Sequence, residues 1–169
     1  MPRGVEIEPI QLSIEVGVRP EAAFGHFVDR FETWWPREYS WSGDALESIG
    51  IEPRVGGFCF ERGPHGLRLD WGRVTAWEPP HRLGFSWQIE MDRTPQPIPA
   101  HASSVELRFE AAEAGCRVTL VHSGFERHAT DGAAYRQGLA APAGWPLILD
   151  RYAANVRRSA EAPWEGLST

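Results

Sequence analysis

Cysteine is scarce in this sequence, and so are the features that mark several large classes of protein. Cys59 and Cys116 are its only cysteines, and they form no Cys-x-x-Cys pair. This excludes a disulfide framework and a cysteine-rich zinc site. No apolar run approaches the roughly 20 residues that a membrane-spanning helix needs. Residues 1–9 carry acidic residues and prolines where a signal peptide has an apolar core. We therefore expect a cytoplasmic protein with free thiols and no membrane partner.

Positive charge is also in short supply. The chain has 17 basic and 23 acidic residues, a net charge of −6, and no stretch rich in lysine or arginine. Phosphate backbones require a concentrated basic surface, so nucleic acid is excluded as a partner. With 169 residues and 42% hydrophobic content, the chain is long enough for a core of its own. We predict one domain over residues 1–169, with its core at about 10–157.

Catalytic and metal-binding signatures are missing as well. There is no Gly-x-Ser-x-Gly motif, and the glycine pair at 56–57 leads into a strand pattern rather than a helix. Cys59 alternates with Phe58 and Phe60, which are better candidates for the inner face of that strand. The histidines show no metal-ligand spacing; they stand at positions 26, 65, 81, 101, 122 and 128. We therefore predict no cofactor and no metal.

Tryptophan, in contrast, is abundant: eight tryptophans accompany two methionines and three tyrosines. One interpretation is a tryptophan-rich core. The other is a cavity walled by rings, because aromatic side chains combine a large apolar area with a polar group.

Hydrophobic periodicity gives the order of the elements. Residues 10–16 alternate as a one-sided strand, and residues 19–29 carry an apolar helical stripe behind Pro20. The Trp34-Trp35 pair falls on a short helix or its exit. Residues 47–92 read as a meander of antiparallel strands, and 103–124 as a hairpin. The segments 93–102 and 126–144 are predicted to be long loops, which are often lids or binding loops.

Six or seven half-apolar strands need a long element to cover them. Residues 144–162 supply it, because their apolar side chains recur at helical spacing on one face; these are Trp145, Ile148, Leu149, Tyr152 and Val156. The predicted class is α+β, with a curved antiparallel sheet of six to seven strands around a long C-terminal helix and two short helices after the first strand.

This order resembles the helix-grip fold of the START-like, or SRPBCC, superfamily. Four segments are similar to one group within it: "IEVGVRPEAAFGHFVDRFETWW", "GRVTAWEPPHRLGFSW", "VTLVHSGF" and "GWPLILDRYAANV". That group is the homologues of the C-terminal domain of the activator of the heat-shock chaperone ATPase, and the resemblance covers about residues 10–157. It implies an apolar cavity between sheet and helix in a superfamily of carriers, polyketide cyclases, sequestering proteins and co-chaperone domains.

A ligand in that cavity would meet the inward side chains of the sheet, the final helix and the Trp34–Trp41 segment. The predicted ligand-binding residues are Trp35, Trp41, Trp71, Phe85, Trp87, Leu107, Phe109, His122, Ile148 and Tyr152. Tyr39 is a further candidate at the cavity mouth.

His122 is the polar exception, since it stands where the strand pattern calls for an aliphatic residue. Its ring could bond a nearby hydroxyl or carbonyl and be purely structural, contact a ligand, or act as a general base. Ser123 cannot pair with it as a nucleophile, because neighbours on a strand point to opposite faces.

The leading hypothesis is a protein that holds a small, largely apolar, aromatic or polyketide-like molecule as a carrier, sensor or sequestering protein. The alternatives are a cyclase or dehydratase that uses the same cavity with His122 as acid/base, and a module that docks on a chaperone. A homodimer is also open.

Overall fold

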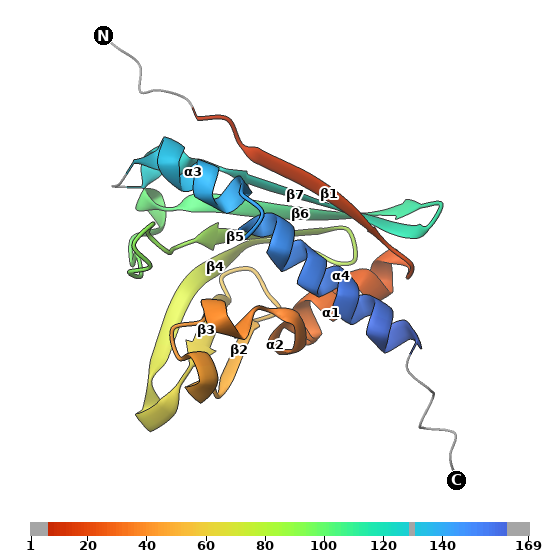
Figure 1. Cartoon of the computed structure of the whole chain (residues 1–169), viewed down its shortest axis with the longest axis horizontal. Coiled ribbons are helices and arrows are strands. Elements are labelled where there is room, and N and C mark those ends of the chain that lie inside the picture. The colour runs from red at the N-terminus through yellow and green to blue at the C-terminus, as the bar shows by residue number, and fades with distance from the viewer. Residues whose placement is uncertain (1–6, 129–130, 162–169) are drawn as a thin grey trace.

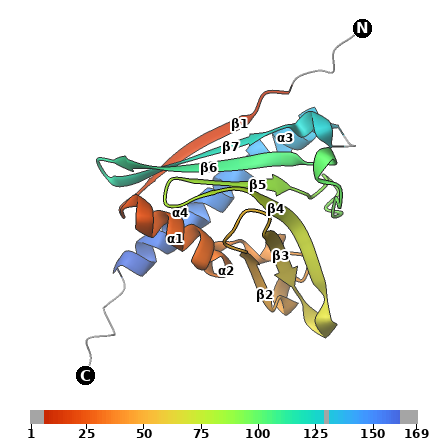
Figure 2. The same ribbon diagram turned by 180° about the vertical axis from the view of Figure 1, so that it is seen from behind.

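The computed structural model describes residues 7–128 and 131–161, and a seven-stranded antiparallel sheet dominates them (Figure 1). The order across the sheet is β1-β7-β6-β5-β4-β3-β2, so the first strand of the chain pairs with the last. Figures 1 and 2 show β4 bending strongly, so that β2 and β3 turn away from the plane of β5, β6 and β7. The strands are β1 (Ile10–Val16), β2 (Ser48–Ile51), β3 (Phe58–Arg62), β4 (Arg68–Glu78), β5 (Arg82–Trp87), β6 (Ser103–Ala112) and β7 (Gly115–Ser123).

Within the described residues, four α-helices accompany the sheet. Short 3₁₀ turns punctuate the connections: η1 (Arg37–Tyr39), η2 (Gly43–Ala45), η3 (Pro64–Gly66), η4 (Pro99–His101) and η5 (Phe125–Arg127). The α-helices are α1 (Pro20–Asp29), α2 (Phe31–Trp34), α3 (Gly132–Ala140) and α4 (Trp145–Glu161). Pro20 opens α1 at the position where its missing N–H costs nothing, and Trp35 is the C-cap of α2.

The long helix α4 crosses the sheet and presents the predicted face to it (Figure 1). All five apolar side chains of that face are at most 3% exposed. The hydroxyl of Tyr152 also donates to the carbonyl of Ala23 in α1 at 2.6 Å, which ties the two helices together. The α+β helix-grip architecture predicted from the sequence is therefore confirmed.

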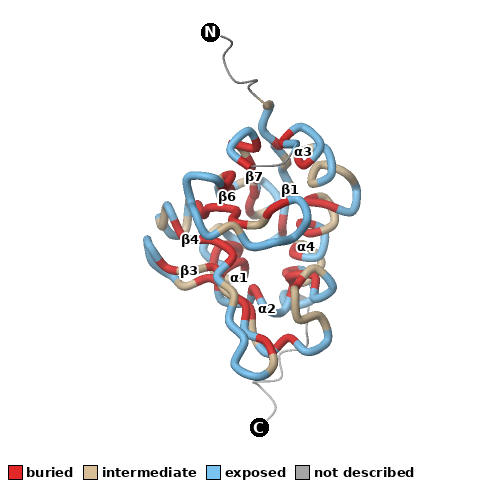
Figure 3. The backbone as a smooth tube through the Cα atoms, turned by 90° about the vertical axis from the view of Figure 1, so that its left-hand side faces the viewer, coloured by how far each residue is buried: buried red, intermediate tan, exposed pale blue. Residues whose placement is uncertain are grey.

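The interior beneath the middle of α4 is filled by rings. Phe27 contacts Trp34 and Tyr152 with ring centroids 4.7 and 5.3 Å apart, and Phe109 closes on Phe24 at 5.1 Å. Figure 3 shows the buried stretches in the middle of the molecule and the exposed ones around it. Edge-to-face pairs of this kind stabilise a core beyond the area they bury, so this part of the domain is a packed core.

The prediction of a loop over 126–144 was wrong for residues 132–140, which form α3. Asp131 caps this helix, since its side chain accepts a hydrogen bond from the backbone N–H of Ala134 at 3.1 Å. An acidic N-cap followed by alanines is a helix start signal, but the glycines in the segment masked it. Residues 129 and 130 lie outside the described part of the chain.

The inner face of β3 is also opposite to the prediction. Cys59 is fully buried, and burial raises the pKa of its thiol well above the usual range. Phe58 and Phe60 lie on the outer face, where guanidinium groups cover their rings: that of Arg73 lies 4.7 Å from the Phe58 centroid and that of Arg68 lies 5.2 Å from the Phe60 centroid. Cation–π contacts explain how these rings are accommodated half-exposed.

Candidate ligand-binding site

A pocket of about 290 Å³ lies where the far end of β5 meets the α3–α4 connection. This is close to the lower limit of the volumes that take small organic ligands, about 300 Å³. Its walls come from four parts of the chain: the segment after α2, the loop after β5, α3 with its connection, and the first turns of α4. The lining residues are Trp35, Tyr39, Trp87, Ile89, Glu90, Met91, Arg93, Tyr135, Gly138, Leu139, Ala143, Gly144 and Ile148.

Two tryptophan rings form the aromatic wall of the pocket. The ring centroids of Trp35 and Trp87 lie 6.3 Å apart at an angle of 50°. Trp35 is supported from behind by Phe31 and Trp71, which stack on it at 4.9 and 5.7 Å. A wall made of supported rings is rigid, and it offers a flat apolar surface to a ligand.

The polar side of the pocket comes from a tight loop between Gln88 and Gln96. The Asp92 carboxylate accepts from the backbone N–H of Thr94 at 3.0 Å, and Arg93 adopts a left-handed conformation with φ of 74°. The backbone N–H of Glu90 donates to the Thr94 carbonyl at 2.8 Å and closes the loop. Both Glu90 and Arg93 of this loop line the pocket.

Trp41 holds this loop against the rest of the domain. Its indole N–H donates to the carbonyl of Arg93 at 2.7 Å. The Arg93 guanidinium lies 6.0 Å from the Trp41 ring centroid and donates to the carbonyl of Tyr39. Trp41 therefore fixes a pocket loop without lining the pocket itself.

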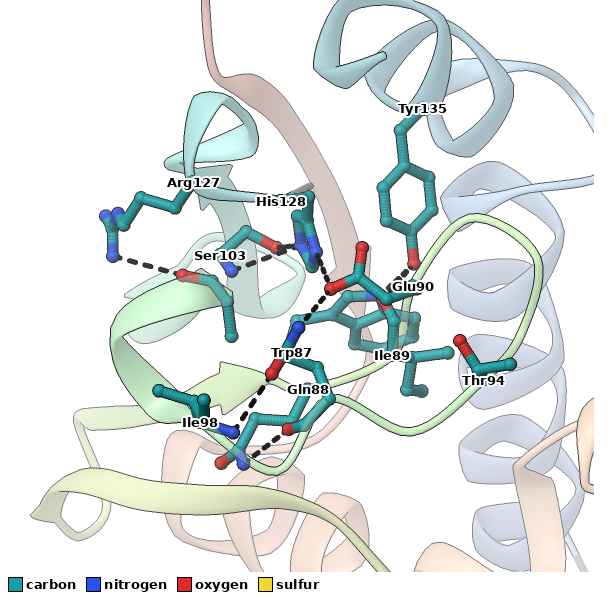
Figure 4. Close-up of polar contacts among 12 residues, drawn as sticks. Trp87, Gln88, Ile89, Glu90, Thr94, Ile98, Ser103, Arg127, His128 and Tyr135 are labelled. Carbon is teal, nitrogen blue, oxygen red and sulfur yellow. Dashed lines mark hydrogen bonds and ion pairs between the residues drawn. The ribbon is translucent and has the colours of Figure 1, made fainter. Parts of the chain in front are cut away.

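Tyr135 of α3 connects the aromatic wall to the polar loop (Figure 4). Its hydroxyl accepts from the indole N–H of Trp87 at 2.7 Å and donates to the carbonyl of Ile89 at 2.6 Å. Burial raises the pKa of Tyr135, which keeps the hydroxyl protonated and able to donate.

Replacing Tyr135 with phenylalanine is expected to lower the free energy of unfolding by about 1–3 kcal/mol, because a buried N–H and a buried carbonyl lose their partner. Urea denaturation of the two proteins measures this difference. Tyr39→Phe is the matched control, since it removes one hydrogen bond, to the Ala143 carbonyl, and is expected to cost about 1 kcal/mol or less. Equal losses for the two variants would show that Tyr135 is not an organising residue.

Behind the Trp87 wall runs a buried chain of hydrogen bonds. The Trp145 indole N–H donates to Nδ1 of His122 at 2.9 Å, and Nε2 of His122 lies 2.7 Å from the Ser103 hydroxyl. The same hydroxyl lies 2.7 Å from Nε2 of His128. Nδ1 of His128 lies 3.2 Å from Oε2 of Glu90, at ion-pair distance. Figure 4 shows the Ser103, His128 and Glu90 end of the chain.

The proton positions along this chain follow from two groups that can only donate, the Trp145 indole N–H and the Ser103 backbone N–H. An indole N–H can only donate, so Nδ1 of His122 accepts and its Nε2 carries the proton. The Ser103 hydroxyl then accepts from His122 and donates to Nε2 of His128, which also receives the Ser103 backbone N–H at 3.2 Å. Nε2 of His128 is therefore an acceptor, and Nδ1 is the ring nitrogen that lies 3.2 Å from the Glu90 carboxylate.

His122 itself is fully buried and does not line the pocket. Burial lowers the pKa of its ring well below the usual range, and the nearby imidazole of His128 lowers it further. Of the three interpretations of His122, a ring satisfied by a nearby hydroxyl describes its contacts, and the neutral form is the one the fold selects.

The structure brings three of the ten predicted ligand-binding residues to the pocket: Trp35, Trp87 and Ile148. Trp41 supports the loop described above. The other six are buried and do not line this pocket; they are Trp71, Phe85, Leu107, Phe109, His122 and Tyr152. Their assignment as ligand contacts stays a prediction, and Tyr39, the candidate for the mouth, does line the pocket.

Sequence reasoning missed Glu90, Ser103 and Tyr135. Glu90 lies beyond β5, which ends at Trp87, so strand alternation does not describe where its side chain points. Ser103 could have been found, because it continues the inward alternation of Val105 and Leu107 and lies diagonally across from His122. Tyr135 lies in the segment predicted to be a loop.

The described residues contain neither a metal-ligand cluster nor a helix that could span a membrane. Within 7–128 and 131–161, no cluster of three or more potential metal-ligating side chains is present. In the same ranges, no helix is both long and apolar enough to cross a membrane.

Comparison with known proteins places the chain among solved structures of the same architecture. The anthrahydroquino-γ-pyrone synthase Txn09, solved in complex with SUM, is 32% identical, with a TM-score of 0.62 over 89% of this chain and 97% of that one. CalC from Micromonospora echinospora, a self-sacrificing resistance protein, is 20% identical, with a TM-score of 0.62 over 92% of this chain and 98% of that one. The second likeness shows the fold alone.

No curated protein matches this chain. The family model for the Activator of Hsp90 ATPase homolog 1-like protein matches residues 18–156. This is most of the chain, and it includes both tryptophans of the pocket wall, the Glu90 loop and most of α4. The chain therefore belongs to the Activator of Hsp90 ATPase homolog 1-like family.

Proposed function

We propose that this protein binds a small planar aromatic molecule, of the polyketide-like kind, in the pocket between the end of β5 and the α3–α4 connection. The observation that carries the proposal is the pocket itself, walled by the supported rings of Trp35 and Trp87 and bordered by one acidic and one basic side chain. An apolar cleft with a few convergent polar groups is the usual form of a ligand site.

The family and the fold support a ligand-binding role without naming the ligand. The 32% identical relative is a synthase of an anthrahydroquino-γ-pyrone, whose name indicates a fused-ring aromatic product. A pocket of about 290 Å³ suits a ligand of two or three fused rings. Likeness to a synthase also favours a second candidate, a cyclase that acts on such a molecule in the same pocket.

The test of this proposal is a substitution that fills the pocket with a larger side chain at a half-buried residue. Leu139 lies on α3 and lines the pocket, so Leu139→Trp adds volume there rather than in the core. A two-ring probe, 2-methoxynaphthalene, is expected to bind the unmodified protein with a Kd on the order of 0.1 mM, from roughly 0.5 kcal/mol per heavy atom. Leu139→Trp is expected to weaken binding at least about ten-fold, measured by isothermal titration calorimetry.

Leu67→Trp is the matched control, because Leu67 is exposed and outside the pocket. It should bind the probe as the unmodified protein does. Unchanged binding by Leu139→Trp would move the site elsewhere, and no binding of two- and three-ring aromatic compounds by the unmodified protein would remove the proposed function. Docking on a chaperone and dimerisation stay predictions.

A further inference from the structure

One oxygen of the pocket has no partner within the described part of the chain. Glu90 is 7% exposed and lines the pocket, yet its Oε1 is buried without a hydrogen bond from any described residue. The hydroxyl of Tyr135, another residue that lines the pocket, in contrast both accepts and donates a hydrogen bond. An unpaired buried acceptor is destabilising, and more so when it is charged. A ligand that donates a hydrogen bond would recover that energy.

The second oxygen of the same carboxylate is held in place. Oε2 accepts from the side-chain amide of Gln96 at 2.9 Å and lies 3.2 Å from Nδ1 of His128. In Figure 4 one oxygen of Glu90 carries these contacts, and the other carries none. The two contacts hold Oε2, and Oε1 is the oxygen of this pocket-lining side chain that they leave without a partner.

The buried chain of hydrogen bonds determines which ring nitrogen of His128 is an acceptor and which one lies toward Glu90. Two donor-only groups, the Trp145 indole at the start of the chain and the Ser103 backbone N–H in its middle, leave Nδ1 as the His128 nitrogen that can carry a proton toward Glu90. A proton already on that nitrogen leaves Glu90 as the acceptor of the pair. Nδ1 of His128 makes no hydrogen bond with a described residue, so its 3.2 Å approach to Oε2 is an electrostatic contact that leaves Oε2 an acceptor.

We propose that Glu90 is the general base of this pocket and accepts the proton of a phenolic or enolic hydroxyl group on the bound aromatic molecule. In that step the O–H bond of the ligand breaks, an O–H bond forms at Oε1, and the electron pair stays on the ligand oxygen, which becomes a nucleophile. Return of the proton restores both groups, so no oxidant or other co-reactant is needed.

This inference rests on the proposed function and replaces His122 by Glu90 as the acid/base of the cyclase alternative. His122 has both ring nitrogens bonded to protein and does not line the pocket, whereas Glu90 does. His128, which acts through Glu90, is a positioning residue.

The test compares 2-naphthol with 2-methoxynaphthalene, which has the same rings without the hydroxyl proton. A site built to accept a hydrogen bond discriminates strongly against an analogue that lacks the donor. The unmodified protein is expected to bind 2-naphthol at least about ten-fold more tightly than the methyl ether, a difference of about 1.4 kcal/mol. Glu90→Gln is expected to bind the two compounds within about two-fold of each other.

A second measurement detects the proton transfer itself. Excited 2-naphthol is a strong acid, so bound naphthol excited beyond tryptophan absorption is expected to emit as naphtholate beside Glu90 and as neutral naphthol in Glu90→Gln. Glu113→Gln, at the exposed tip of the β6–β7 hairpin, is the matched control and should behave as the unmodified protein.

The outcomes separate the two proposals. Tight binding of both compounds with no preference for naphthol, or naphtholate emission that survives in Glu90→Gln, would overturn the role of Glu90 and leave the pocket intact. Binding of neither compound would overturn the proposed function and this inference with it. The comparison of the two compounds in the unmodified protein needs no variant, so it stands even if Glu90→Gln folds poorly.

Discussion

Replacing Trp145 with alanine is expected to lower the free energy of unfolding by about 3–5 kcal/mol, the largest effect of any single change proposed for this protein. Trp145 is fully buried at the start of α4, and its ring contacts Trp35 at 6.3 Å and Trp87 at 5.3 Å. The substitution opens a cavity behind the aromatic wall and leaves Nδ1 of His122 without its donor.

Trp145→Phe separates these two losses. It keeps most of the ring but removes the indole N–H, so it is expected to cost about 1–3 kcal/mol for the unpaired nitrogen of His122. Urea denaturation followed by circular dichroism measures both variants. The pocket wall also loses its support in Trp145→Ala, and the affinity for two-ring compounds should fall with it. A loss below about 1 kcal/mol for alanine would show that the wall does not depend on α4.

Acid is expected to destabilise the fold through His122. Burial lowers the pKa of His122 in the folded protein well below 6.5, while the unfolded chain takes up the proton at about that ordinary value. The unfolded state therefore binds more protons as the pH falls, and the stability present above pH 6.5 is lost below it. For one such histidine the loss between about pH 7.5 and about pH 5.5 is about 1.4 kcal/mol.

His26 adds a contribution of the same sign, because burial lowers its pKa despite a hydrogen bond with Asn155 that raises it. The variant that isolates His122 is His122→Gln, since an amide supplies an acceptor for Trp145 and a donor for Ser103 but does not titrate. It is expected to be less stable at neutral pH and to show a shallower loss in acid. The control is His101→Gln, at an exposed position in η4, which should keep the full slope. Equal slopes for both variants would mean that His122 is protonated in the fold.

Much of this architecture follows from local pattern. Alternation over residues 10–16 and 103–123, the proline at the start of α1, and the apolar stripe of residues 145–156 each reflect a period that a strand or helix imposes on its buried face. Those periods fixed the element order, and the element order together with four short segments indicated the family.

Sequence patterns fail to predict the structure where an element ends, or where residues distant in the sequence cover one of its faces. Glu90 lies beyond the end of β5 at Trp87, where alternation no longer applies, and α3 was missed because Asp131 caps a segment rich in glycine and alanine. Phe58 and Phe60 were predicted to lie on the inner face of their strand, but they lie on its outer face, where Arg73 and Arg68 cover their rings. In each case, the periodicity of a single element shows neither where that element begins or ends nor which distant residues cover it.

The candidate site is divided in the same way. The sequence alone determined that tryptophans would gather on the concave side and that an imidazole would stand among aliphatic residues in the last strand, because strand alternation dictates which side chains point inward. Only the tertiary structure decided that the rings fill the middle of the domain and leave a pocket at one end. It also decided that His122 is enclosed while Glu90 meets the pocket, since these depend on packing and hydrogen-bond partners brought together from distant parts of the chain.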